Sequence, residues 1–128
     1  MPDSAGAGSP RALIVDDDDP IRLMLSKIVE RHSFVVETAR DGQEAIERLR
    51  DNEYQLIVLD LMMPRVDGYA VLQYMKEHKP EYLARTIIAS AVPESEILKR
   101  VSATNVKIRC KPFDMRQFIT DIESLSAG

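Results

Sequence analysis

The stretch Ala12-Leu13-Ile14-Val15-Asp16-Asp17-Asp18-Asp19 (ALIVDDDD) joins an apolar run to four consecutive carboxylates. A run of apolar residues without polar alternation is typical of a strand that is covered on both faces, as in a parallel sheet. Neighbouring carboxylates repel one another, so we interpret these four as having separate roles. The question is what each of them does at the end of a buried strand.

The last two carboxylates of the run indicate the start of a helix. Asp19 precedes Pro20, and a capping residue followed by proline at the first helical position is a common helix start. We predict that Asp19 caps this helix and that Asp18 lies in its first turn, where the helix dipole favours an anion. Asp16 and Asp17 then remain at the carboxyl end of the strand, where open α/β sheets bind ligands.

Short apolar runs alternate with helical repeats along the rest of the chain. The predicted strands after the first fall at residues 34–36, 56–59, 86–89 and 106–110, and apolar residues at helical spacing fall within 21–28, 45–49, 71–75, 97–101 and 118–125. Asp41 with Glu44, and Asp114 with Gln117, have the spacing of a capping residue and its partner three positions later. The alternation predicts an α/β fold, a doubly wound five-stranded parallel sheet with five flanking helices.

Length and composition are those of one globular domain. The chain has 128 residues, of which 45% are hydrophobic and 30% charged, and this balance is not that of a disordered chain. Residues 1–10, MPDSAGAGSP, are rich in Gly, Ala, Ser and Pro. We therefore predict a flexible N-terminal tail over residues 1–10 and a single domain over residues 11–128.

Charge and composition also exclude several functions. A net charge of −4 argues against direct nucleic-acid binding. The apolar runs are too short to span a membrane, and the first ten residues lack the features of a secretory signal. Cys110 is the one cysteine, so we predict a small core residue without a disulfide, in a cytoplasmic protein.

Three more polar residues end predicted strands: Asp60 after residues 56–59, Ser90 after 86–89 and Lys111 after 106–110. Parallel strands deliver their last residues to the same edge of a sheet, and neighbouring strands lie about 4.8 Å apart. If the first and third strands are neighbours, Asp60 shares one pocket with Asp16 and Asp17.

Such an acidic pocket needs a proton or a cation to persist. Two carboxylates about 4 Å apart repel each other by about 4 kcal/mol at an effective dielectric constant of about 20. A site made of oxygen ligands with room for water suits Mg²⁺. Lys111 would add a mobile positive charge, and Ser90 would add a hydroxyl donor.

Four motifs in this order resemble a response-regulator receiver domain: VDDDDPIR (residues 15–22), VLDLMMPRVDG (58–68), ASA (89–91) and KPF (111–113). The resemblance runs from about residue 12 to residue 125, and the spacing of the motifs is that of the family. It implies the flavodoxin-like strand order 2-1-3-4-5. It also implies a role in two-component signal transduction, as a regulatory domain rather than an enzyme.

The resemblance implies a phosphorylation site and a metal site. Asp60 would be the phosphoacceptor, receiving a phosphoryl group from a sensor histidine kinase or a phosphotransfer protein. Asp17 would bind Mg²⁺ directly and Asp16 would bind it through water. Asp60 and the backbone carbonyl of Met62 would complete the protein ligands. The chain would thereby assist its own phosphorylation and its slow dephosphorylation.

The resemblance also implies how the phosphoryl group acts once it is attached. Ser90 would be the switch hydroxyl that moves onto a phosphoryl oxygen, and Lys111 would pair with the phosphoryl group. The Lys111–Pro112 bond would be cis. Met62 and Val92 would flank the path of the hydrolytic water. Because neither side chain can position this water, we expect a long-lived phosphoaspartate. An unidentified effector, and a homodimer formed on phosphorylation, would be the downstream partners.

Two alternatives stay open. A degenerate receiver would act as a docking module without phosphorylation, although this chain has all five residues of the phosphorylation site. A phosphatase would use Asp16 as the nucleophile of the D-x-D pattern over residues 16–18. Ile108 stands where many receivers have Tyr or Phe, three residues before Lys111, so we expect transmission without an aromatic rotamer.

Overall fold

A parallel sheet in the order β2-β1-β3-β4-β5 forms the middle layer of the molecule. The computed structural model describes residues 9–101, 106–111 and 114–127. The described strands are β1 (Arg11–Val15), β2 (Val35–Ala39), β3 (Leu56–Leu59), β4 (Thr86–Ser90) and β5 (Lys107–Cys110). The described helices are α1 (Asp19–Glu30), α2 (Gly42–Asp51), α3 (Gly68–His78), the 3-10 helix η1 (Pro80–Arg85), α4 (Glu94–Arg100) and α5 (Met115–Ala127). The predicted fold class and strand order are confirmed.

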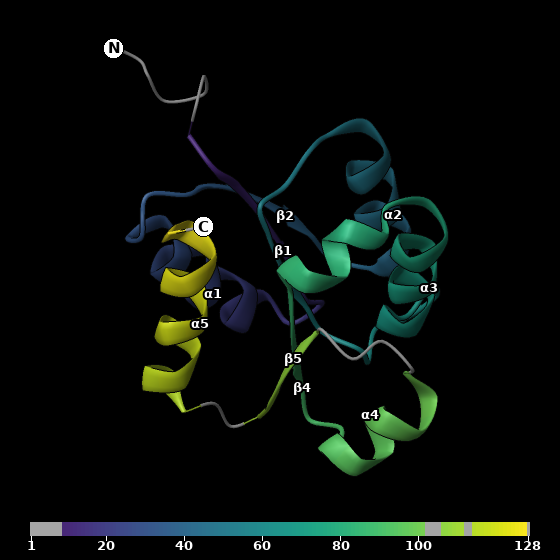
Figure 1. Ribbon diagram of the computed structural model, residues 1–128. Coiled ribbons are helices and arrows are strands. Elements are labelled where there is room, and N and C mark those ends of the chain that lie inside the picture. The colour runs from purple at the N-terminus through teal and green to yellow at the C-terminus, as the bar shows by residue number, and fades with distance from the viewer. Residues whose placement is uncertain (1–8, 102–105, 112–113, 128) are drawn as a thin grey trace.

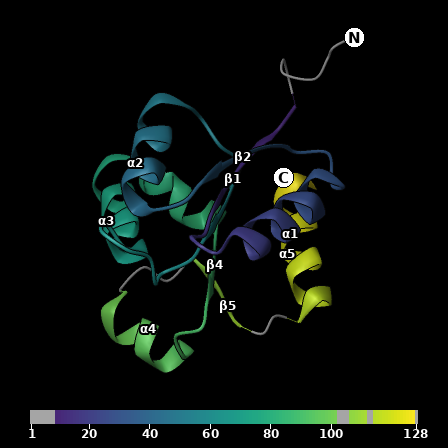
Figure 2. The same cartoon turned by 180° about the vertical axis from the view of Figure 1, so that it is seen from behind.

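The helices form two outer layers. Helices α1 and α5 lie side by side on one face of the sheet, whereas α2 and α3 cover the other face (Figures 1 and 2). Ile97 of α4 belongs to the same core as α2 and α3. None of the helices in the described residues is long and apolar enough to cross a bilayer.

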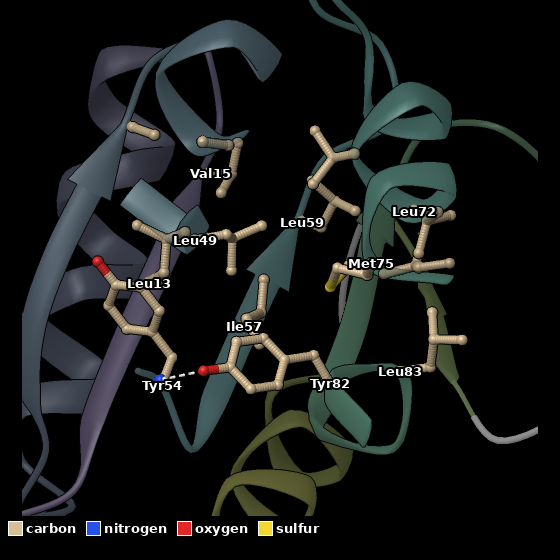
Figure 3. Close-up of a cluster of buried hydrophobic side chains, with 14 of the residues drawn as sticks. Leu13, Val15, Leu49, Tyr54, Ile57, Leu59, Leu72, Met75, Tyr82 and Leu83 are labelled. Atoms are coloured by element: carbon tan, nitrogen blue, oxygen red, sulfur yellow. Dashed lines mark hydrogen bonds between the residues drawn. The ribbon is translucent and has the colours of Figure 1, made fainter. Parts of the chain in front are cut away.

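Each central strand contributes alternate residues to two cores, which explains its lack of polar alternation. In β1, Leu13 and Val15 face α2 and α3, whereas Ala12 and Ile14 face α1 and α5. The core under α2 and α3 also contains Leu49, Leu72, Met75 and two buried tyrosines, Tyr54 and Tyr82 (Figure 3). Phe118 and Ile122 of α5 pack in the opposite core with Leu25 of α1.

The start of α1 corrects one prediction. Asp18, not Asp19, is the N-cap: its side chain accepts a hydrogen bond from the Ile21 N–H at 3.0 Å, and Asp19 is the first helical residue. Either position suits the sequence, because Pro20 is tolerated wherever the helix leaves an N–H without a partner. The other two predicted caps are confirmed, since Asp41 accepts from the Glu44 N–H and Asp114 from the Gln117 N–H.

Three further features differ from the sequence expectations. Strand β2 runs to Ala39 instead of ending at residue 36, because an edge strand accommodates polar residues that interrupt an apolar run. The 3-10 helix η1 was not predicted. Cys110 is exposed, so its prediction as a core residue is wrong: it is the last residue of β5, the other edge strand.

Candidate functional site

Asp16 and Asp60 lie side by side where β1 and β3 end. Val15 pairs with Leu59 in the register of these two strands, so the next residue of each is an aspartate. The Asp60 N–H donates to the Val15 carbonyl at 2.9 Å, which continues the ladder by one step. Both side chains are buried, with 1% and 5% of the residue exposed.

A carboxylate cluster forms at this edge of the sheet. Asp16, Asp17 and Asp60 each offer an oxygen, and these three oxygens lie within 4.8 Å of one another. The Lys111 ammonium lies 3.1 Å from Asp16 Oδ2 and 4.0 Å from Asp60 Oδ1. Lys111 thus lies within 4.0 Å of two of the three carboxylates, and the cluster keeps a net negative charge when all three are ionised.

The electrostatic environment of the cluster shifts the pKa of Asp60. Burial, reinforced by the charge of Asp16, raises the pKa of Asp60 to about 6, while Lys111 and the Met62 N–H act in the opposite direction. Above that pH Asp60 is an ionised, poorly solvated carboxylate. Such a group gains from any cation that reaches it.

Hydrogen bonds orient both buried carboxylates. Asp16 Oδ1 accepts from the Asp18 N–H at 2.9 Å, and Asp60 Oδ1 accepts from the Met62 N–H at 3.3 Å. No residue in the described ranges donates a hydrogen bond to the second oxygen of Asp60, Oδ2. That oxygen retains its lone pairs for a metal ion or an electrophile.

Ser90 and Lys111 are connected through the backbone at the end of β4 and β5. The Lys111 N–H donates to the Ser90 carbonyl at 2.7 Å. The buried Ser90 hydroxyl oxygen accepts from the Val92 N–H at 3.2 Å. In this structure the Ser90 hydroxyl is thus engaged by the turn that follows β4.

The two predicted rate-tuning residues have different surroundings. Met62 is 61% exposed beside the cluster, whereas Val92 is half-buried and packs against the core under α3. Pro112, the predicted cis-proline, lies outside the described residues. Ile108 packs against the same core as Val92.

Gly68 shapes the loop after the candidate phosphoacceptor and was not among the predicted site residues. Its N–H donates to the Leu61 carbonyl at 3.0 Å, and a Cβ atom at this position would lie 2.3 Å from the Asp60 carbonyl oxygen. The signal for it was the DG pair at residues 67–68, which follows the acidic strand end. Asp67 also caps α3 through the Ala70 N–H.

The donor set fits a hard divalent cation. Three carboxylate oxygens, two from buried residues and one from an exposed residue, match the oxygen ligands and open solvent positions that Mg²⁺ takes in proteins. The geometry argues against the D-x-D phosphatase alternative, because Asp18 is used as a helix cap and does not belong to the cluster.

The fold and the site together define a class of protein, and the comparisons agree. A family model for the response regulator receiver domain matches residues 12–123, so the chain belongs to this family. As a receiver domain it has a regulatory role consistent with two-component signalling.

The chain is also similar to a curated regulatory protein. The chain is 38% identical over 121 residues to the transcriptional regulatory protein SrrA of Staphylococcus aureus (strain NCTC 8325 / PS 47), a match covering 91% of this chain and 48% of that protein. The chain thus spans about half the length of the curated relatives that it matches.

Solved structures give the same fold. The Francisella response regulator 1452 receiver domain has a TM-score of 0.80 and 27% identity, covering 92% of this chain and 97% of that one. A chain of the CheX-CheY-BeF3-Mg+2 complex from Borrelia burgdorferi also has a TM-score of 0.80 and 27% identity, covering 91% and 88%.

Proposed function

We propose that the chain is a phosphorylation-controlled switch in which Asp60 accepts a phosphoryl group from a histidine kinase or a phosphotransfer protein. The observation that carries this proposal is the cluster of Asp16, Asp17 and Asp60 beside Lys111. Receiver-family membership supports it. The cluster matches the requirements of phosphoryl transfer, which are positioning of the attacking oxygen and neutralisation of negative charge.

Mg²⁺ is the cofactor that we propose for this reaction. Asp17, Asp60 and the backbone carbonyl of Met62 would hold it directly, and Asp16 through water. When bound, it would neutralise charge on the phosphoryl oxygens and on the carboxylates. The Borrelia neighbour, described with BeF3 and Mg²⁺, supports this assignment together with the donor set of the cluster.

The protein's own groups would orient the reaction. The Met62 N–H holds Asp60 through Oδ1, which leaves Oδ2 to form the new bond to phosphorus. The bond from phosphorus to the histidine nitrogen breaks, and its electron pair remains on that nitrogen. Lys111, 4.0 Å from Asp60 Oδ1, would shift from Asp16 toward a phosphoryl oxygen.

The switch itself would involve Ser90. Its hydroxyl oxygen accepts a hydrogen bond from the Val92 N–H, which leaves the Ser90 O–H to donate to a phosphoryl oxygen when the side chain moves onto the phosphoryl group. The turn after β4 would then change conformation. Ile108 has neither a ring nor a hydroxyl, so transmission would run through this turn and α4 rather than through an aromatic rotamer.

The lifetime of the phosphorylated state would be long. Met62 and Val92 have no side-chain group that can position a hydrolytic water. Correct placement of an attacking water contributes to its rate, and each 1.36 kcal/mol is a factor of ten. Replacing both by polar residues, Met62→Asn with Val92→Glu, should speed dephosphorylation about tenfold if water placement contributes about 1.4 kcal/mol.

We further propose that residues 11–128 form the receiver domain after a flexible tail of residues 1–10. Its partners would be a cytoplasmic histidine kinase or phosphotransfer protein and an effector that reads the phosphorylated face. Homodimer formation on phosphorylation is an extension of the same proposal. No nucleic-acid or membrane contact is proposed for this domain.

Intact mass spectrometry after incubation with a small phosphodonor tests the proposal. One added phosphoryl group is expected with Mg²⁺ and none with a chelator, with Asp60→Asn or with Asp17→Ala. Labelling that survives Asp60→Asn would contradict the phosphoacceptor assignment. A complete lack of labelling in the folded wild type would favour the docking-module alternative.

A further inference from the structure

Arg22 lies in the first turns of α1 and its side chain returns to the acidic loop. Its Nη1 donates to the Asp16 carbonyl at 2.9 Å, and its Nη2 donates to Asp19 Oδ1 at 2.5 Å. The side chain is 15% exposed. One planar guanidinium therefore joins the two ends of the loop that carries Asp17.

Asp17 depends on that loop more than its neighbours do. Asp16 is buried and bonded to Lys111, and Asp18 is bonded to the start of α1. Asp17 is the exposed member of the carboxylate cluster, and no group in the described ranges hydrogen-bonds its side chain. Its position is set by the backbone on either side of it.

We propose that Arg22 is a positioning residue that holds the loop of residues 16–19 in the conformation that binds the cation. This rests on the proposed Mg²⁺-dependent function. Arg22 does so in two ways: it fixes the Asp16 peptide, and it pairs with Asp19, which is not a member of the cluster. A carboxylate outside the site is thereby kept on the helix side of the loop.

The charge of Arg22 and its two hydrogen bonds should have opposite effects on Mg²⁺ affinity, so the two contributions can be separated. A positive charge next to the site repels a divalent cation, so removing that charge alone should strengthen Mg²⁺ binding. Loss of the two bonds should weaken Mg²⁺ binding, because groups that orient metal ligands typically affect affinity at least tenfold. Lysine keeps the charge but cannot reproduce the planar two-pronged contact.

The test is Mg²⁺ titration of the metal-free chain, followed by the amide NMR shifts of residues 16–18. Arg22→Lys and Arg22→Gln are compared with the wild type and with Lys27→Gln, which removes an exposed positive charge in the last turn of α1. We expect about tenfold weaker binding in Arg22→Lys and a smaller loss in Arg22→Gln, because removal of the positive charge offsets part of the weakening. Lys27→Gln should bind Mg²⁺ as the wild type does. Amide dispersion elsewhere in the spectrum verifies the fold of each variant.

Each outcome of the Mg²⁺ titration either supports or contradicts the positioning role of Arg22. Unchanged affinity in Arg22→Lys, or unchanged or tighter binding in Arg22→Gln, would overturn the positioning role while leaving the proposed function intact. If one of these variants fails to fold, the other decides by the same criterion. A folded wild type without any Mg²⁺ response would overturn the proposed metal site and, with it, the role of Arg22.

Discussion

The two ends of the sheet treat their polar groups in opposite ways. At the carboxyl ends of β1 and β3, three carboxylates lie together, and Lys111 pairs with only two of them, Asp16 and Asp60. Near the amino ends of β3 and β4, the Tyr82 hydroxyl accepts from the Tyr54 N–H at 3.1 Å (Figure 3). The Tyr54 hydroxyl donates to Glu37 of β2 at 2.6 Å. The Tyr54 carbonyl accepts from Arg85.

This difference separates stability from function. Glu37 is also paired with Arg11, and burial raises the pKa of Tyr54 and Tyr82, so both tyrosines stay neutral hydrogen-bonding groups. At the amino end these polar groups are therefore matched, each with a hydrogen-bonding or oppositely charged partner, and they contribute to the stability of the fold. The carboxyl end keeps uncompensated negative charge, which is unfavourable alone but available to a cation and a phosphoryl group.

The largest effect is expected from Gly68→Ala, which breaks the carboxyl end sterically. The added Cβ would lie 2.3 Å from the Asp60 carbonyl oxygen and 2.6 Å from Leu61 Cα, and backbone atoms cannot move away as a flexible side chain can. We expect a loss of about 3 kcal/mol in the free energy of unfolding by urea denaturation. The exposed Gln73→Ala on the same helix should change it by less than about 0.5 kcal/mol. A Gly68→Ala variant as stable as the wild type would contradict the close packing.

Tyr82→Phe tests the matched amino end. It removes the acceptor of the buried Tyr54 N–H, and leaving a buried donor without a partner costs about 2 kcal/mol. The proposed phosphorylation of Asp60 should be unaffected in conditions where the variant is folded. Tyr74→Phe is the control, because no residue in the described ranges hydrogen-bonds the Tyr74 hydroxyl. Equal stability of the two variants would show that this hydrogen bond contributes nothing.

Asp60→Asn should stabilise the metal-free chain at pH 7, by roughly 1 to 2 kcal/mol, because it removes one charge from the cluster. The raised pKa of Asp60, about 6 against an ordinary 3.8, sets the pH window. Between these values the native state retains a proton that the unfolded state has lost, so wild-type stability falls as pH rises from about 4 to about 6.

The gain from Asp60→Asn should accordingly be largest above pH 6 and vanish near pH 4. Urea denaturation with a chelator present, at a series of pH values, measures this dependence. Asp51→Asn, at an exposed carboxylate paired with Arg50, is the matched control. A gain that did not change with pH would show that the effect is not electrostatic.

The smallest effect is expected at Asp41, where charge is matched. The Glu44 N–H and the Arg65 guanidinium hold the pKa of Asp41 below its usual value. Its contribution is therefore present above about pH 4 and is lost as the pH falls through the lowered pKa. Asp41→Asn keeps the helix cap but removes the charge, so we expect a loss of about 0.5 kcal/mol at pH 7.

This small loss should shrink toward zero at low pH, which is the reverse of the Asp60→Asn behaviour. Chelated samples measured over the same pH series as the Asp60 variants allow a direct comparison. A stabilising Asp41→Asn change at neutral pH would mean that the negative charge of this carboxylate, like that of Asp60, destabilises the folded state.

Local sequence determined most of the architecture. The continuous apolar run at residues 12–15 and its counterpart at 56–59 define strands buried on both faces, because only a sheet covered by two layers of helices removes both sets of side chains from water. The carboxylates that follow parallel strands lie at the same edge of the sheet, and the resemblance to receiver domains implied the strand order that makes these two strands neighbours. The candidate site was predictable as a set of residues for that reason.

Only the tertiary structure decided how those residues are used. Whether Asp18 or Asp19 caps α1 depends on where the chain turns after β1, and both satisfy the same local pattern. The exposure of Cys110 depends on β5 being an edge strand. The bond from Arg22 to the Asp16 carbonyl, and the bond from the Tyr82 hydroxyl to the Tyr54 N–H, join side chains to backbone groups. Backbone groups are identical at nearly every residue, so nothing in the sequence marks which of them a side chain will reach once the elements pack.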